Sequence, residues 1–145
     1  MTKTFLHVGL PKTATTFLQE KIFPRLSDTT LISRPYTQQS KAFNKLQYAD
    51  DCYYDSEEIK KEIGKITASK ILISDELLCG IKFTINRSII VRRLKEVFPQ
   101  AEIILFIRGH QSLLMSSYNQ AIKMGGYTGK IEEYIWYPKK RIYLR

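Results

Sequence analysis

Residues 5–19 read FLHVGLPKTATTFLQ and join a short apolar run to a small polar loop and an amphipathic segment. The run from Phe5 to Gly9 has the length and apolar character of a buried strand, and it ends in glycine. Beyond the loop, Leu18, Ile22 and Leu26 recur at helical spacing and so share one face. This stretch therefore predicts a strand, a loop and a helix in direct succession.

The same succession repeats along the rest of the chain. The apolar residues at 71–73 are consecutive rather than alternating, which is typical of a parallel strand covered on both faces. Ser56, which precedes two glutamates, is expected to cap one of the helices. We expect strands at residues 5–9, 29–33, 70–74 and 102–107, and helices at 15–26, 40–48, 56–66, 85–98 and 111–124. This alternation predicts an α/β fold of three layers, a parallel sheet flanked by helices and joined by right-handed crossovers.

The composition fits a single cytoplasmic domain. The chain has 145 residues, 43% of them hydrophobic, which is enough apolar surface to offset the entropy of folding. Its longest apolar stretch is residues 103–107, far short of the roughly 18 residues that a membrane span requires. Pro11 and Lys12 follow the first strand too closely for a secretory signal. Cys52 and Cys79 lack the spacing of a metal or redox site and are expected to be reduced.

The charge balance favours an anionic partner. There are 23 lysines and arginines against 14 acidic residues, a formal net charge of +9. Such an excess raises the local concentration of anions, whether nucleic acid, a nucleotide or an acidic polysaccharide. Charge by itself does not choose among these three.

The loop from Gly9 to Thr16 concentrates groups that hold an anion. It offers backbone amides before a helix, the ammonium of Lys12 and the hydroxyls of three threonines. An ordinary capped turn with a solvated lysine is the alternative reading of the same residues. The loop differs from the common GxxxxGK[ST] pattern, because its lysine comes early and no second glycine precedes it.

FLHVGLPKTATTFLQ resembles the 5′-phosphosulfate loop of the sulfotransferases that use 3′-phosphoadenosine 5′-phosphosulfate (PAPS), whose pattern is PK[ST]GTT. Ala14 stands at the family's usual glycine and would be strained if the loop required a positive φ there. A second segment, IRGHQSLLMSSYNQ at 107–120, resembles the part of the family that holds the 3′-phosphate through an arginine and a serine. These residues are Arg108 and Ser116 here.

The resemblance implies a P-loop NTPase-like fold and transfer of a sulfuryl group from PAPS to an acceptor hydroxyl or amine, on a glycan or a small molecule. It makes Lys12 the catalytic lysine beside the leaving phosphate. A metal is not expected, because cationic side chains take the role that magnesium has in kinases, and no nucleic-acid partner is expected. The cofactor-binding residues that it implies are Lys12, Thr13, Ala14, Thr15, Thr16, Arg108 and Ser116.

A catalytic base is expected near the sulfur, and Glu76 is the first candidate. It follows the strand in ILISDELL, where related carbohydrate sulfotransferases often present a glutamate. Asp75 is the neighbouring alternative, and one of the two acids is as readily the cap of the next short helix. His7 and His110 are further conceivable bases, with packing or hydrogen bonding as their more ordinary role.

The end of the chain departs from the family. Residues 130–145, KIEEYIWYPKKRIYLR, match no part of its later section, so we expect a single domain that lacks its C-terminal part. A truncated chain, a broken gene product and a short domain completed by a partner all remain open. An incomplete sheet edge would favour self-association. Two other functions remain as alternatives, a degenerate module that binds a nucleotide or polyanion without catalysis and, less favoured for want of GK[ST], a P-loop kinase of small molecules.

Overall fold

The computed structural model describes residues 2–10, 12–34, 36, 41–79 and 86–136. The chain divides into two compact units, Met1–Phe106 and Ile107–Arg145, and each is described by itself. None of the helices in the described residues has the length and hydropathy of a transmembrane segment.

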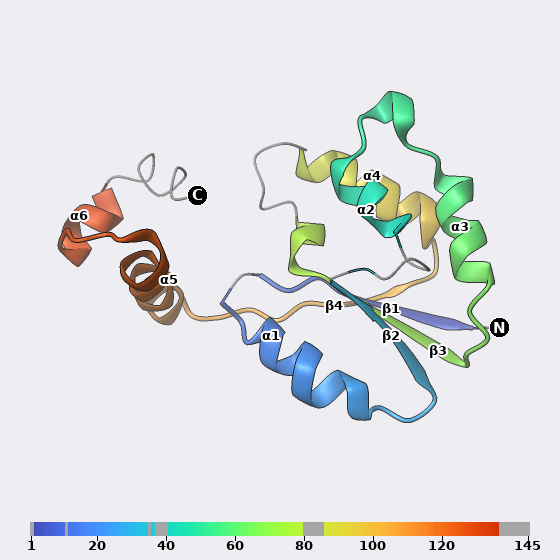
Figure 1. Cartoon of the computed structure of the whole chain (residues 1–145), viewed down its shortest axis with the longest axis horizontal. Coiled ribbons are helices and arrows are strands. Elements are labelled where there is room, and N and C mark those ends of the chain that lie inside the picture. Colours follow the sequence, from blue (N-terminus) through green and yellow to red (C-terminus); the bar gives the residue numbers. More distant parts are fainter. Residues whose placement is uncertain (1, 11, 35, 37–40, 80–85, 137–145) are drawn as a thin grey trace. The chain divides into compact units, whose positions relative to one another are not determined.

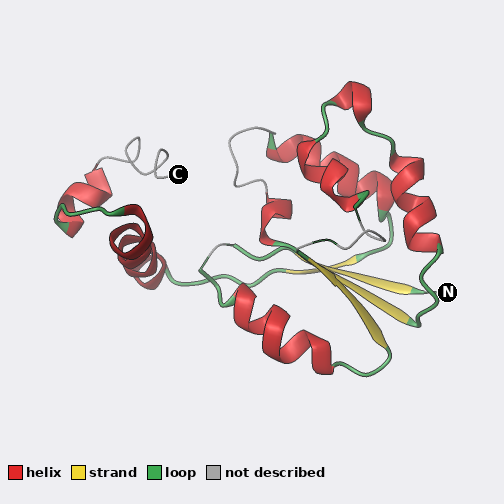
Figure 2. Ribbon diagram, viewed as in Figure 1, coloured by secondary structure: helices red, strands yellow, loops and turns green. Residues whose placement is uncertain are grey.

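The first unit is built on a four-stranded parallel sheet (Figure 2), as the alternation of the sequence predicts. The strands run side by side in the order β2-β3-β1-β4. Their bounds are Lys3–His7 for β1, Thr29–Ser33 for β2, Lys70–Ser74 for β3 and Glu102–Ile104 for β4. The consecutive apolar residues of β3 are all buried, because this strand has neighbours on both sides and helices over both faces.

The edge strand β4 is shorter than the sequence predicts. The apolar pattern extends from residue 102 to 107, but the ladder with β1 pairs only Glu102 to Ile104. Leu105 and Phe106 follow the ladder as exposed residues. Hydrophobicity indicates that a segment can form a strand, whereas its length depends on how far the neighbouring strand continues beside it.

Helices cover both faces of the sheet (Figure 1). The helical segment after β1 lies on one face and consists of α1 (Thr15–Phe17), a π-helical turn η1 (Leu18–Ile22) and a 3₁₀ turn η2 (Phe23–Arg25). The opposite face carries α2, α3 and α4. The bounds of the elements on that side are Phe43–Tyr48 for α2, Asp51–Tyr53 for the 3₁₀ turn η4, Ser56–Gly64 for α3 and Arg87–Val97 for α4, and a further 3₁₀ turn, η5 (Glu76–Cys79), follows β3.

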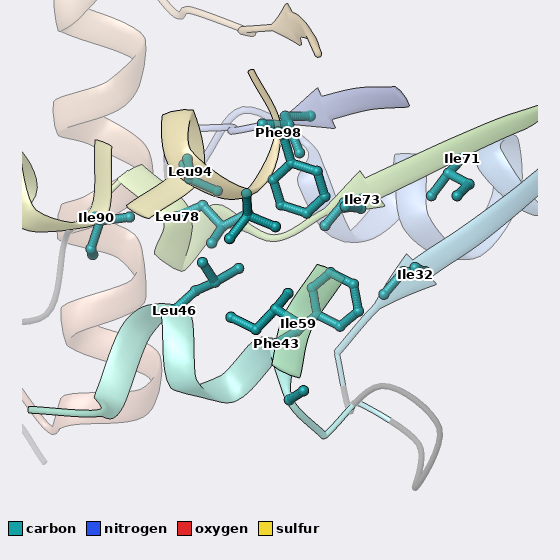
Figure 3. Packing of buried hydrophobic residues seen from close by; sticks show 13 residues of the cluster. Ile32, Phe43, Leu46, Ile59, Ile71, Ile73, Leu78, Ile90, Leu94 and Phe98 are labelled. Atoms are coloured by element: carbon teal, nitrogen blue, oxygen red, sulfur yellow. The ribbon is translucent and has the colours of Figure 1, made fainter. Parts of the chain in front are cut away.

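The hydrophobic core lies between the sheet and α2, α3 and α4 (Figure 3). Ile71 and Ile73 of β3 face Leu46, Ile59 and neighbouring side chains of these helices. Full burial of one such aliphatic side chain stabilises the fold by roughly 1.5–3 kcal/mol. The helix α3 is capped by Asp55, whose carboxylate accepts a hydrogen bond from the Glu57 amide, and the expected cap Ser56 is instead the first helical residue.

The described part of the second unit, residues 107–136, contains two helices, α5 (His110–Gly125) and α6 (Ile131–Trp136). Gly126 ends α5 with a φ of 64°, a left-handed conformation that glycine adopts without strain. The rings of Tyr118, Tyr127 and Tyr134 pack edge to face, with centroids 5.5–6.0 Å apart, and join the two helices. The basic residues at 139–145 lie outside the described residues.

Candidate functional site

The carboxyl ends of β1 and β3 lie side by side, because the two strands pair along their whole length. The connection after β1 runs through α1 on one face of the sheet, and the connection after β3 runs through α4 on the opposite face (Figure 1). Neighbouring parallel strands whose connections leave to opposite faces form a switch point, where open α/β sheets bind ligands. We call the residues after β1, β2 and β3 the switch-point site, comprising loop 9–16, Arg34, Asp75 and Glu76.

The loop of this site has an unusual backbone. Lys12 has a φ of 68° and Ala14 a φ of 62°, both in the left-handed region that non-glycine residues rarely adopt. The sequence predicts backbone strain at Ala14 if the loop requires a positive φ there. The structure has this positive φ, so the backbone at Ala14 is strained. The Thr13 hydroxyl donates to the Leu10 carbonyl at 2.6 Å and tightens the turn. Ala14 is the N-cap residue of the helical segment that begins at Thr15, and its methyl group cannot accept a hydrogen bond from the first amides.

Close packing fixes the loop against its own strand. An added Cβ at Gly9 would lie 2.5 Å from the Thr15 Cγ2 atom and 3.3 Å from the His7 Nε2 atom. Only glycine leaves room for this approach, so packing requires glycine at this position, two residues after the end of β1 at His7 and not within the strand as the sequence predicted. Pro11 lies outside the described residues.

The predicted base Glu76 lies against the predicted anion loop. The Thr15 hydroxyl donates to the Glu76 Oε2 atom at 3.0 Å, although the two residues are 61 positions apart. On its other oxygen, Oε1, Glu76 faces the Arg34 guanidinium at 3.7 Å. Thr15 is buried, whereas Thr16 is exposed and Lys12 is half-buried. The structure thus brings Thr15 and Glu76 into direct contact.

Asp75, the alternative base, is fully engaged in the interior. Its Oδ1 atom accepts from the Leu77 amide at 2.9 Å and pairs with the Arg34 Nε at 2.8 Å. Its Oδ2 atom accepts from the Tyr36 hydroxyl at 2.6 Å and from the Gln47 Nε2 at 2.5 Å. Through the hydrogen bond from the Leu77 amide, Asp75 caps η5. The sequence had suggested this capping role for either Asp75 or Glu76, and the structure assigns it to Asp75.

Burial and the adjacent Asp75 carboxylate raise the pKa of Tyr36 far above its ordinary value of 10.0. The phenol therefore stays protonated and acts as a donor to Asp75. This buried network holds the segment after β3, and with it Glu76, in one place.

His7 has a packing and hydrogen-bonding role in the structure. It is fully buried, and its ring packs edge to face against Phe23 and Phe106 at 5.1 and 5.3 Å. Its Nδ1 atom lies 2.7 Å from the Ser74 Oγ atom. Burial lowers the pKa of His7 below its ordinary 6.5, so the ring is neutral near pH 7. Its Nε2 atom has no hydrogen-bond partner among the described residues.

The predicted 3′-phosphate residues belong to the second unit. Arg108 and Ser116 line one surface pocket of about 420 Å³, together with Gln111, Ser112, Met115 and Asn119. Arg108 precedes α5, and Ser116 lies within this helix with its side chain half-buried. The structure therefore brings this arginine and serine to the same pocket. The loop residues Lys12 to Thr16 belong to the first unit.

Four polar residues in or beside the switch-point site were not among the site residues predicted from the sequence. Arg34 follows β2, so the rule that selects residues after strand ends would have identified it as it identified Glu76. Tyr36 and Gln47 reach Asp75 from segments with no recognisable motif. Gln19 donates from the π-helical turn to both the carbonyl and the hydroxyl of Ser74, at 3.0 and 2.9 Å.

Among the residues that the structure describes, no three His, Cys, Asp or Glu side chains gather closely enough to hold a metal ion. No family model, no curated protein and no solved structure matches the chain in comparisons of sequence and fold.

Proposed function

We propose that this chain is a sulfotransferase with a P-loop NTPase-like fold, which transfers a sulfuryl group from PAPS to a hydroxyl or amine, on a carbohydrate acceptor. Lys12 and residues 13–16 would hold the 5′-phosphosulfate, and Arg108 and Ser116 would hold the 3′-phosphate. The observation that carries the proposal is the contact between Thr15 of the anion loop and Glu76 at the switch point of the sheet. The loop proposed to hold the 5′-phosphosulfate and the candidate base thereby lie at one site.

This transfer requires the acceptor and the sulfuryl group to be held in line and the negative charge on the leaving phosphate to be neutralised. The acceptor oxygen attacks the sulfur in line, the bond from sulfur to the 5′-phosphate oxygen breaks, and adenosine 3′,5′-bisphosphate leaves. Glu76 takes the acceptor proton. Lys12 neutralises the negative charge that grows on the leaving phosphate oxygen, and this stabilises the transition state more than the ground state.

One observation favours a second candidate, a degenerate nucleotide-binding module. Ala14 occupies a left-handed position where the sulfotransferase pattern has glycine, so the loop carries backbone strain. A loop that has lost its catalytic geometry tolerates such a residue more readily than an active one. Binding and turnover therefore require separate measurements.

Calorimetry tests the nucleotide class. Adenosine 3′,5′-bisphosphate should bind more tightly than ATP with Mg²⁺, and Lys12→Ala should weaken the bisphosphate about 10- to 100-fold. Lys21→Ala, which removes an exposed lysine from the same helical segment, is the matched control and should bind as the wild type does. A preference for ATP would overturn the sulfotransferase proposal in favour of a kinase.

Transfer of radiolabelled sulfate from PAPS to a panel of glycans then separates an enzyme from a binding module. Wild type and Lys21→Ala should both transfer label, and Lys12→Ala should not. Tight bisphosphate binding without transfer to any acceptor would favour the degenerate module.

A further inference from the structure

The Thr15 hydroxyl can donate one hydrogen bond, and in this structure the Glu76 carboxylate accepts it. The O···O distance is 3.0 Å and Thr15 is 5% exposed, so water competes little for the bond. The same hydroxyl belongs to the loop whose groups would hold the 5′-phosphate. A phosphate oxygen and the Glu76 carboxylate would therefore compete for the same hydrogen-bond donor, the Thr15 hydroxyl.

Glu76 is held against the loop from two sides. Thr15 contacts Oε2 at 3.0 Å, and the Arg34 guanidinium lies 3.7 Å from Oε1. Arg34 is itself anchored through its Nε atom to the buried Asp75 carboxylate at 2.8 Å. Because Arg34 is fixed in this way, release of the Thr15 bond frees one carboxylate oxygen while the other keeps its cationic neighbour.

We propose that Thr15 is an exchange point between Glu76 and the nucleotide, an inference that rests on the proposed function. When a 5′-phosphate enters the loop, the Thr15 hydroxyl turns to a phosphate oxygen and releases Oε2 of Glu76. Glu76 then accepts the proton of the sulfate acceptor. The hydrogen bond from Thr15 lowers the basicity of this oxygen, so its release makes Glu76 a stronger base once the donor has bound. Thr15 is a positioning residue for Glu76 in this scheme as well as a phosphate ligand.

The exchange predicts that Glu76 opposes bisphosphate binding through Thr15. We would measure the dissociation constant of adenosine 3′,5′-bisphosphate by calorimetry for wild type, Glu76→Ala, Thr15→Val and the double variant. Glu76→Ala should tighten binding about tenfold in the wild-type background, since one charge-assisted hydrogen bond no longer has to be broken. In the Thr15→Val background the same change should give at most a roughly twofold gain from reduced charge repulsion.

Two controls separate the exchange from simple electrostatics. Thr15→Ser keeps the hydroxyl and should restore the tenfold effect of Glu76→Ala. Glu20→Ala removes an exposed acid of the same helical segment and should leave the affinity unchanged. If Glu76→Ala tightened bisphosphate binding equally in the wild-type and Thr15→Val backgrounds, the exchange would be wrong. Charge repulsion between Glu76 and the phosphate would then explain the whole effect. A wild type that does not bind the bisphosphate would instead overturn the proposed function, and the exchange with it.

A second measurement needs no substitution at Thr15. The carboxyl ¹³C resonance of Glu76 should shift when wild-type protein is saturated with the bisphosphate, because the carboxylate loses a hydrogen-bond donor. The corresponding resonance of Glu20 should not move. An unchanged Glu76 resonance at saturation would contradict the exchange even if all the variants failed to fold.

Discussion

The Nδ1 atom of His7 lies 2.7 Å from the Ser74 hydroxyl oxygen and joins the carboxyl ends of the neighbouring strands β1 and β3. Gln19 donates to the same hydroxyl, so the helical segment after loop 9–16 is joined to this point too. The direction of the hydrogen bond between Ser74 and Nδ1 follows the tautomer of His7. A charged His7 would donate from both ring nitrogens, so the Ser74 proton would have to turn to another acceptor.

The first prediction concerns the pH dependence of stability. Burial lowers the pKa of folded His7 below the 6.5 of the unfolded chain. As the pH falls through about 6.5, the unfolded chain takes up a proton that folded His7 resists, so the free energy of unfolding decreases until the folded pKa is passed. Urea unfolding of wild type and His7→Gln between about pH 5 and 8 should show a steeper loss for wild type. Parallel pH profiles would contradict this role of His7.

The second prediction concerns the strained loop. Ala14→Gly should raise the free energy of unfolding by about 1 kcal/mol, because glycine adopts the φ of 62° without a steric penalty. Relief of strain within the loop should also leave bisphosphate binding at least as tight as in wild type. Urea unfolding and calorimetry measure the two effects.

Glycine substitutions at Ala42 and Asp28 are the two controls for Ala14→Gly. Ala42→Gly makes the same substitution at a φ of −57° and should lower stability by roughly 0.5–1 kcal/mol. Asp28→Gly, at a φ of 54° outside the loop, should raise stability without altering bisphosphate affinity. If Ala14→Gly destabilised the protein as Ala42→Gly does, the left-handed conformation would not be the source of strain.

The sequence predicts the sheet well, because its strands are marked by local apolar runs. The predicted bounds of β2 and β3, residues 29–33 and 70–74, match the structure. The helix predicted at 15–26 is helical throughout residues 15–25, but η1 winds it as a π-helical turn. Apolar spacing at every third or fourth residue does not distinguish these windings.

The candidate site is predictable only in part, for a physical reason. Glu76 and the loop both follow strand ends, and the topology of parallel sheets brings such positions to one edge. Tyr36 and Gln47 join the site through contacts with the buried Asp75 carboxylate. Gln47 lies in α2 and Tyr36 in the segment between β2 and α2, so these contacts depend on tertiary packing, which no local pattern encodes.

The third prediction tests the close approach at Gly9. Gly9→Ala should lower the free energy of unfolding by roughly 1–3 kcal/mol, because the new methyl group would overlap Thr15 Cγ2. Thr15→Ser removes that methyl group and should recover much of the loss in the double variant. Gly64→Ala, where no atom lies within 4 Å of the new Cβ, should cost nothing. Destabilisation that Thr15→Ser does not relieve would place the clash elsewhere.

The fourth prediction separates the two neighbouring acids. Asp75→Ala should destabilise the protein by about 3 kcal/mol or more. Tyr36, Gln47 and Arg34 would lose the carboxylate that accepts their hydrogen bonds and would have no replacement in the interior. Glu76→Gln should change the free energy of unfolding by less than about 1 kcal/mol, since this side chain is partly exposed. Sulfate transfer, however, should fall at least about 100-fold in Glu76→Gln. Full transfer by Glu76→Gln would exclude it as the base.

The fifth prediction concerns the pocket that Arg108 and Ser116 line in the second unit. Arg108→Ala should weaken adenosine 3′,5′-bisphosphate about 10- to 100-fold, because the planar guanidinium pairs with phosphate through two parallel hydrogen bonds. Adenosine 5′-phosphosulfate has no 3′-phosphate, so its affinity should change less than about threefold. Ser116→Ala should show the same selectivity with a smaller loss, and Lys123→Ala, an exposed cation of the same helix, should affect neither ligand. Calorimetry with both ligands measures these differences. Equal losses for the two ligands in Arg108→Ala would remove Arg108 from the 3′-phosphate, because only a contact with that group distinguishes them.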